Sequence, residues 1–188
     1  ADDQAVYVLD RTGNIRVAHQ EPLVRAPGST ARLTAGNEPA IIFSAPDGST
    51  VRLLFDGTVK RDVLQGITAT HHSDFADVDG DNTTDRLYLD KGVLQAFDGS
   101  GREIWHYSAG SGELAGPFIF SAGTGERRTA VYDPGRELLH LVGRSGTSVT
   151  GFPRHSGPWF NIGRVTNKST WNLITGENGS YLCNYELN

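Results

Sequence analysis

Short apolar runs separated by turn residues make up most of the chain. The runs are rich in β-branched and aromatic side chains, and helical periodicity is nearly absent. Turn signals such as residues 46–49 (Pro-Asp-Gly-Ser) and 98–101 (Asp-Gly-Ser-Gly) stand between them. Strands joined by tight turns predict an antiparallel all-β protein. The main apolar runs cover residues 5–9, 41–43, 51–55, 87–89, 93–97, 138–142 and 181–185.

The runs repeat with a period near 40 residues. One run of each repeat begins at residues 5, 40, 85, 129 and 170, so the starts lie 35, 45, 44 and 41 residues apart. A period of this length is typical of the blades of a β-propeller. We therefore predict the second blade strands at 5–10, 40–45, 85–90, 129–134 and 170–175, and the third at 14–19, 51–55, 92–97, 137–142 and 180–186.

Outer and inner strands complete the predicted blades. We expect fourth strands at residues 23–25, 58–64, 103–108 and 147–152, and first strands at 117–120 and 159–163. The units 1–30, 31–66, 67–110, 111–155 and 156–188 then form about four to five four-stranded antiparallel blades. A sandwich with accidental spacing is the alternative.

The predicted strand count also bears on completeness. The first unit opens in mid-blade, and the last has no residues left for its fourth strand. We expect the C-terminal arc of a larger propeller, whose missing strand comes from an N-terminal remainder of the same propeller. Five shortened blades that close by themselves are the other possibility.

Composition excludes some partners. The 188 residues contain 22 acidic and 17 basic side chains, a net charge of −5, and no Lys/Arg block, which argues against a nucleic-acid surface. No apolar run reaches about 18 residues, so we expect no membrane insertion. The lone Cys183 excludes a disulfide framework and is expected to be a small core residue.

One loop carries recognisable chemistry. Residues 77–85 place carboxylates at loop positions 1, 3, 5 and 9, on Asp77, Asp79, Asp81 and Asp85, and Thr83 offers a backbone carbonyl. Ca²⁺ prefers six to eight oxygen ligands at about 2.3–2.6 Å, which such a loop can supply. Four clustered carboxylates repel one another until a cation neutralises them. A solvated acidic turn is the alternative interpretation.

The loop and its flanks resemble the calcium loop of integrin-type FG-GAP repeats and of related bacterial surface (VCBS-type) propeller repeats. In those repeats the loop links the first and second strands of a blade, and Phe75, Ala76 and residues 86–89 fit that pattern. Asn82 stands where Gly is usual, a mild departure because Asn tolerates left-handed backbone. The resemblance implies one structural Ca²⁺, held by the five residues named above.

A second resemblance covers residues 94–105, which are similar to the PQQ-like repeat although the turn is one residue shorter. In such repeats the aromatic residue corresponding to Trp105 packs between blades. We expect Trp105 to have that structural role, without contact to a cofactor.

No catalytic residue is predicted. His71 and His72 are adjacent, so on a strand they point to opposite faces and cannot hold one metal together. Four acids could in principle form a glycosidase pair, but we expect them to be solvated; they are Asp74, Asp90, Glu103 and Glu113. The chain has no nucleophile elbow, phosphate loop or His-Glu-x-x-His motif.

These observations predict a non-catalytic, calcium-binding propeller module. Such a module would present loops to a protein or carbohydrate ligand in the periplasm, outside the cell or at the cell surface, where calcium is millimolar. The alternative is the propeller domain of a calcium-dependent polysaccharide lyase or glycoside hydrolase. Trp159 and Tyr107 could stack on sugar rings or fill the core between blades.

Overall fold

Every regular element in the described parts of the chain is a β-strand. The computed structural model describes residues 6–19, 22–34, 38–122, 126–165, 170–177 and 181–187. Within these ranges no helix has the length and apolar character needed to cross a membrane. The chain divides into two compact units, Ala1–Phe75 and Ala76–Asn188, and the boundary falls inside strand β8 (His72–Ala76).

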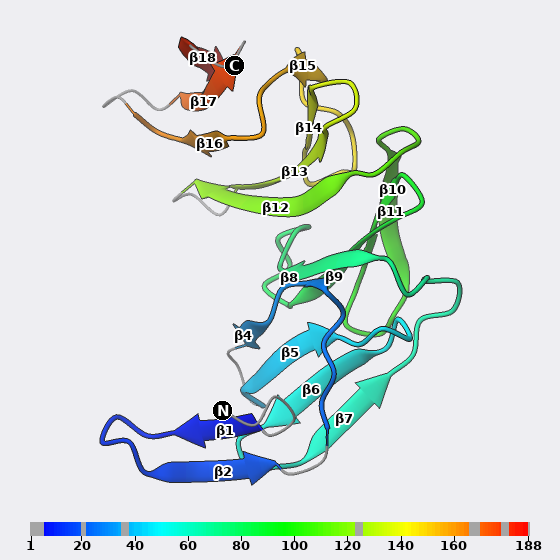
Figure 1. The fold of residues 1–188 in the computed structure, drawn as a ribbon, viewed down its shortest axis with the longest axis vertical. Helices are drawn as coiled ribbons and strands as arrows, with labels where there is room; N and C mark the ends of the chain where they lie inside the picture. Colours follow the sequence, from blue (N-terminus) through cyan, green and yellow to red (C-terminus); the bar gives the residue numbers. More distant parts are fainter. Residues whose placement is uncertain are drawn as a thin grey trace. The chain divides into compact units, whose positions relative to one another are not determined.

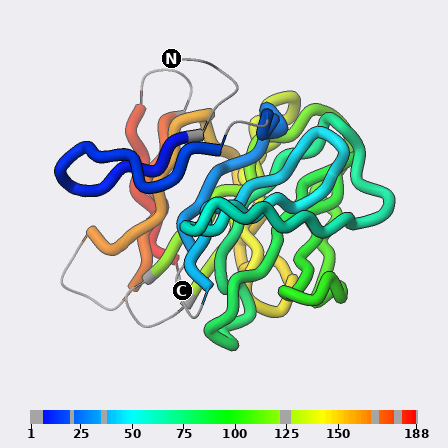
Figure 2. Tube along the Cα trace, turned by 90° about the horizontal axis from the view of Figure 1, so that it is seen from below, coloured from blue at the N-terminus to red at the C-terminus, as the bar shows by residue number. Residues whose placement is uncertain are grey.

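The first unit contains a hairpin and a four-stranded sheet (Figure 1). Strands β1 and β2 pair antiparallel and form the hairpin drawn in dark blue in Figure 2. Strands β4-β5-β6-β7 pair antiparallel in chain order, and β3 pairs parallel with β8. The bounds are β1 (Val6–Leu9), β2 (Ile15–His19), β3 (Gly28–Ser29), β4 (Arg32–Thr34), β5 (Ala40–Ser44), β6 (Thr50–Leu54) and β7 (Val59–Asp62).

The described residues of the second unit form three antiparallel groups of strands: β9-β10-β11, β12-β13-β14-β15 and β16-β17-β18. In each group, strands that follow one another in the chain are neighbours in the sheet, as hairpin connections require. The bounds are β9 (Asp85–Asp90), β10 (Val93–Phe97), β11 (Glu103–Ser108), β12 (Ala115–Ala122), β13 (Glu126–Asp133), β14 (Leu138–Val142), β15 (Arg154–His155), β16 (Phe160–Gly163), β17 (Trp171–Glu177) and β18 (Tyr181–Leu187).

Apolar core covers both faces of the sheet β12–β15. Successive residues of a strand point to opposite faces, so Val131 and Val142 pack in one cluster while Leu139 and Leu141 pack in another. The first cluster continues through β9, β10 and β11, and the second through β16, β17 and β18. Face-to-face packing of small antiparallel sheets is therefore the principle of the second unit.

Aspartate side chains stabilise several of the hairpin turns by hydrogen bonds. In the β5–β6 turn, Asp47 Oδ1 accepts hydrogen bonds from the backbone N–H (2.9 Å) and the hydroxyl (2.6 Å) of Ser49. Asp98 makes the same two bonds to Ser100 in the β10–β11 turn. Between Asp47 and Ser49, Gly48 has φ at 81°, a left-handed conformation that glycine adopts without strain. The repeated Asp-x-Ser pattern thus determines where these strands end.

Most of the strands predicted from the sequence are present. The fourth strands expected at 58–64 and 103–108 are confirmed as β7 and β11. The groups β4–β7, β12–β15 and β16–β18 lie within the units 31–66, 111–155 and 156–188, whose exact boundaries stay predictions.

Two predicted fourth strands are wrong. Residues 147–152 form a turn, with one bridge from Val142 to Ser148, and pairing with β14 resumes only at β15. Gly151 (φ 85°) reverses the chain there, and Pro153 has no N–H to donate to a ladder. Residues 23–25 are irregular, and the next residue, Ala26, bonds its N–H to the carbonyl of Ser44 (2.8 Å).

Truncating a core leucine tests this packing. Leu141 is fully buried, so Leu141→Ala leaves a cavity and should lower the free energy of unfolding by about 2–5 kcal/mol. Leu182 is 79% exposed, and Leu182→Ala should change it by less than about 0.5 kcal/mol. Urea unfolding of both variants measures the difference; equal losses would contradict this assignment of the core.

Candidate metal centre

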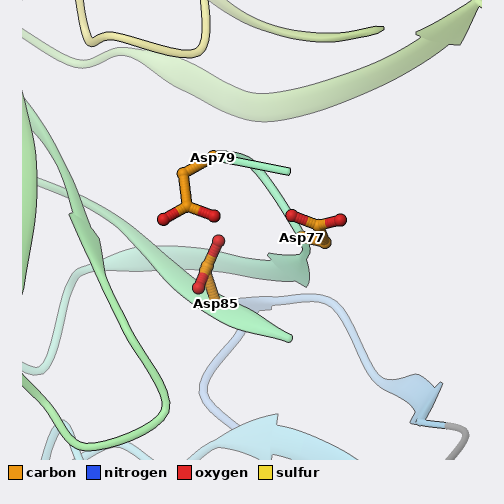
Figure 3. A group of neighbouring side chains, drawn as sticks. All are labelled: Asp77, Asp79 and Asp85. Atoms are coloured by element: carbon orange, nitrogen blue, oxygen red, sulfur yellow. The ribbon is translucent and has the colours of Figure 1, made fainter. Parts of the chain in front are cut away.

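Three carboxylates of the loop between β8 and β9 converge. Asp77, Asp79 and Asp85 each offer an oxygen atom, and these atoms lie within 4.8 Å of one another. Figure 3 shows the three carboxylate groups gathered around a common space. Asp77 and Asp79 are partly buried and Asp85 is buried. The structure therefore brings together three of the five residues that the sequence predicts as ligands.

Asp85 is the most constrained of the three. It is the first residue of β9 and has no exposed surface. Its Oδ2 accepts the N–H of Val78 at 2.8 Å, whereas its Oδ1 is buried without a hydrogen-bond partner. A buried carboxylate oxygen with no partner is costly, and a cation bound between the three carboxylates would satisfy it. The residues present thus fit a hard cation.

Local hydrogen bonds shape the loop around Asp77. Its two carboxylate oxygens accept the N–H groups of Gly80 (2.6 Å) and Asn82 (3.2 Å). Asp79 Oδ1 accepts the N–H of Asp81 at 3.1 Å. Asn82 has φ at 67°, a left-handed conformation that asparagine tolerates better than most residues. The loop therefore turns tightly enough to bring positions 1, 3 and 9 together.

The other two predicted ligands bond to each other. Asp81 Oδ1 accepts both the N–H (2.7 Å) and the hydroxyl (2.6 Å) of Thr83, and these bonds lower the pKa of Asp81. Both residues are exposed. Asp81 does not belong to the three-carboxylate group found among the described residues.

The charge balance of the loop is unfavourable to ionised Asp85. Burial, followed by the negative charges of Asp79 and Asp81, raises the pKa of Asp85 from 3.8 to about 6. The backbone N–H groups of Val78 and Asp79 lower this pKa but do not cancel the effect. An added divalent cation would reverse this penalty by favouring the ionised form.

Arg144 contacts the loop but is not among the residues predicted from the sequence. This residue lies in the turn after β14, and its Nε donates to the carbonyl oxygen of Asp79 at 2.9 Å. A terminal N–H of the guanidinium donates to the same oxygen. The two residues are 65 positions apart, and nothing in the local sequence of either one indicates the contact.

The acids considered as a glycosidase pair are not uniformly solvated. Asp74 is 2% exposed and accepts two hydrogen bonds of 2.7 Å from Arg32, so the expectation of a solvated acid is wrong there. It is also wrong for Asp90, which is 8% exposed. Glu103 and Glu113 are exposed as expected, and Glu103 pairs with His106 at 2.7 Å.

A buried polar network in the first unit was also missed. The hydroxyl of Ser44 bonds to His71 Nε2 at 2.7 Å and to the hydroxyl of Ser73 at 2.6 Å. His71 Nδ1 lies 2.6 Å from the carbonyl oxygen of Thr68. The serines and the histidine are at most 2% exposed, so this network is structural and fixes the chain that enters β8.

The three discussed aromatic residues and Cys183 differ in exposure. Trp105 is 8% exposed and packs in the first core cluster, which confirms its predicted structural role. Tyr107 is partly buried, and its hydroxyl lies 3.0 Å from His140 Nδ1. Trp159 is 84% exposed, so the core-filling interpretation is wrong for it. Cys183 is only partly buried, in β18.

Comparison with known proteins identifies the fold. No protein-family model and no curated protein matches the chain. Among solved structures, a catalytically inactive virginiamycin B lyase from Staphylococcus aureus with quinupristin matches at a TM-score of 0.56 and 13% identity, covering 98% of this chain and 64% of the other. The structure of BBS1N in complex with ARL6DN matches at a TM-score of 0.59 and 11% identity, covering 99% of this chain and 59% of the other.

A streptogramin B lyase matches at a TM-score of 0.57 and 12% identity, covering 98% of this chain and 62% of the other. These structural neighbours are β-propeller-like proteins. The chain is a β-propeller protein. It spans about three fifths of the length of the solved chains that it matches. The likeness carries the fold alone, and the FG-GAP and PQQ-like resemblances stay predictions.

The raised pKa of Asp85 predicts how metal-free stability depends on pH. The folded state holds this proton more tightly than the unfolded state, so the stabilising contribution is complete below about pH 3.8 and is lost as pH rises through about 6. Asp85→Asn mimics the protonated form and should raise the Tm near pH 7 in EGTA, by about 2–4 °C for each kcal/mol released. Thermal unfolding between about pH 4 and pH 8 compares the two proteins; parallel pH profiles would contradict the assignment.

Proposed function

We propose that this β-propeller protein is a calcium-binding module whose cation stabilises the loop between β8 and β9. The observation that carries the proposal is the buried carboxylate of Asp85. Its Oδ1 has no hydrogen-bond partner, and the group lies beside two further carboxylates. Asp77, Asp79 and Asp85 would hold the ion. Asp81 and the carbonyl of Thr83 stay predictions from the sequence.

The donor chemistry favours Ca²⁺. The three converging groups are all carboxylates, which suit hard cations, whereas zinc and copper sites draw on imidazole and thiolate. The bound ion would supply positive charge between carboxylates that otherwise repel one another. Asp77 and Asp79 keep the loop in shape through their bonds to backbone N–H groups. Asp85, the first residue of β9, holds the loop to that strand by accepting the N–H of Val78.

The proposed role of the module is interaction with a protein or carbohydrate partner at the cell surface or in the periplasm. A loop site with three carboxylates suits the millimolar calcium outside cells, where such sites work with a Kd of about 10⁻⁴–10⁻³ M. Trp159 offers a broad, exposed apolar surface for a partner. That BBS1N was solved in complex with ARL6DN supports protein binding as one use of this fold.

Two of the similar structures are lyases, but at 12–13% identity they share the fold and lend no activity to this chain.

Calcium should stabilise the protein through this loop. At a calcium concentration about 100-fold above Kd, binding to the folded state alone adds about 2.7 kcal/mol and raises the Tm by several degrees. Asp79→Asn and Asp85→Asn should remove most of this gain, because each replaces a charged ligand by a neutral one. Thermal unfolding in EGTA and in calcium, together with calorimetric titration, measures both effects.

Asp47→Asn is the matched control for those variants. Asp47 occupies an aspartate turn with the same two bonds to its serine, and it is not part of the three-carboxylate group. The control should keep the full calcium response. An unchanged Tm of the natural protein in calcium, or an equal response in Asp85→Asn, would refute the metal site.

Removing the exposed tryptophan tests the interaction surface. Trp159→Ala should change the free energy of unfolding by less than about 0.5 kcal/mol, since the side chain is 84% exposed, yet weaken a stacked ligand by about 1 kcal/mol or more. Binding to a panel of glycans and to candidate surface proteins compares the variant with Leu182→Ala, another exposed apolar truncation. A ligand that binds all three proteins equally would exclude Trp159 from the surface.

A further inference from the structure

The turn after β14 contacts the calcium loop through Arg144. The guanidinium donates two N–H groups to one oxygen, the carbonyl of Asp79, and therefore leaves the carboxylate of that residue to the cation site. A charged donor makes a stronger hydrogen bond to a carbonyl than a neutral donor does. The guanidinium also lies against Gly80, where an added Cβ would clash with it. Both contacts involve the tight part of the loop.

The same turn contacts Trp105. A Cβ added to Gly146 would lie 2.6 Å from the Cβ of Trp105 and 2.7 Å from its Cγ, so glycine is needed for the indole to pack here. Inside the turn, the N–H of Gly143 donates to the carbonyl of Thr147 (2.9 Å), and that of Gly146 donates to the carbonyl of Gly143 (3.0 Å). Five residues thus connect the calcium loop to the buried tryptophan of β11.

We propose that Arg144 is a positioning residue that couples calcium binding in the loop to the order of the turn at residues 143–147, and through it to the packing of Trp105. This inference rests on the proposed calcium site. Calcium fixes the backbone at Asp79 and Gly80, and the fork of Arg144 passes that restraint to the turn. The coupling is reciprocal, because a turn that holds the carbonyl of Asp79 in place also pre-forms the loop for the ion.

The size of the effect follows from reciprocity. Couplings of this kind change affinity by about 5-fold or more, and the same factor applies in both directions. Arg144→Ala should therefore weaken calcium binding by about 5-fold, although it removes a positive charge that by itself disfavours a cation. Arg144→Lys keeps the charge but lacks the planar fork, so it should weaken binding as well.

Residue-resolved hydrogen exchange tests the coupling directly. In the natural protein, calcium should slow exchange at the amides of Gly143 and Gly146 by about 5-fold or more, together with the amides of residues 77–85. In Arg144→Ala, calcium should still protect the loop amides at saturating concentration, whereas the turn amides should no longer respond.

Two internal controls separate the possible failures. The turn from Ala45 to Ser49 has the same two backbone bonds and should not respond to calcium in either protein. Arg102→Ala removes another exposed arginine, paired with Asp98, and should leave calcium affinity unchanged. If calcium slows exchange in the loop but not in the turn, the coupling is refuted and the calcium site stands. The same holds if calcium slows exchange in the turn equally in the natural protein and in Arg144→Ala. If neither responds, the proposed function itself fails.

Discussion

The buried carboxylate of Asp85 is the constraint on which the candidate site depends. Because β9 must be buried on both faces, its first residue brings a carboxylate into the interior and leaves one oxygen without a partner. The loop before it relieves only part of this cost: the N–H of Val78 bonds the carboxylate, but two further carboxylates lie beside it, and the pKa of Asp85 stays raised. The same strand that completes the core thus creates a need for positive charge at its beginning.

The turn at residues 143–147 supplies a positive charge near the loop but does not neutralise its carboxylates. The guanidinium of Arg144 donates its hydrogen bonds to the carbonyl of Asp79 and not to a carboxylate, so the three carboxylates remain available to a cation. Gly146, two residues after Arg144, packs against Trp105. Short antiparallel sheets that pack face to face are joined in this way by their turns, and a turn that contacts both a charged loop and a buried aromatic side chain can transmit an effect between them.

Local patterns explain why much of the fold could be predicted. Strands such as β5, β9, β10 and β14 alternate or bury their side chains continuously, and aspartate or glycine turns end them within a few residues. The predicted strands at 23–25 and 147–152 failed because apolar composition alone does not supply ladder partners. Prolines and a left-handed glycine direct the chain elsewhere at those places.

The sequence by itself determined the all-β class, the near-40-residue repeat and the acidic loop, because each depends on residues close together in the chain. It also pointed to Asp77, Asp79 and Asp85 as neighbours. Only the tertiary structure decided that Asp74 is buried against Arg32 and that Arg144 meets the loop. Those contacts of Asp74 and Arg144 join residues 42 and 65 positions apart, a distance over which no local propensity acts.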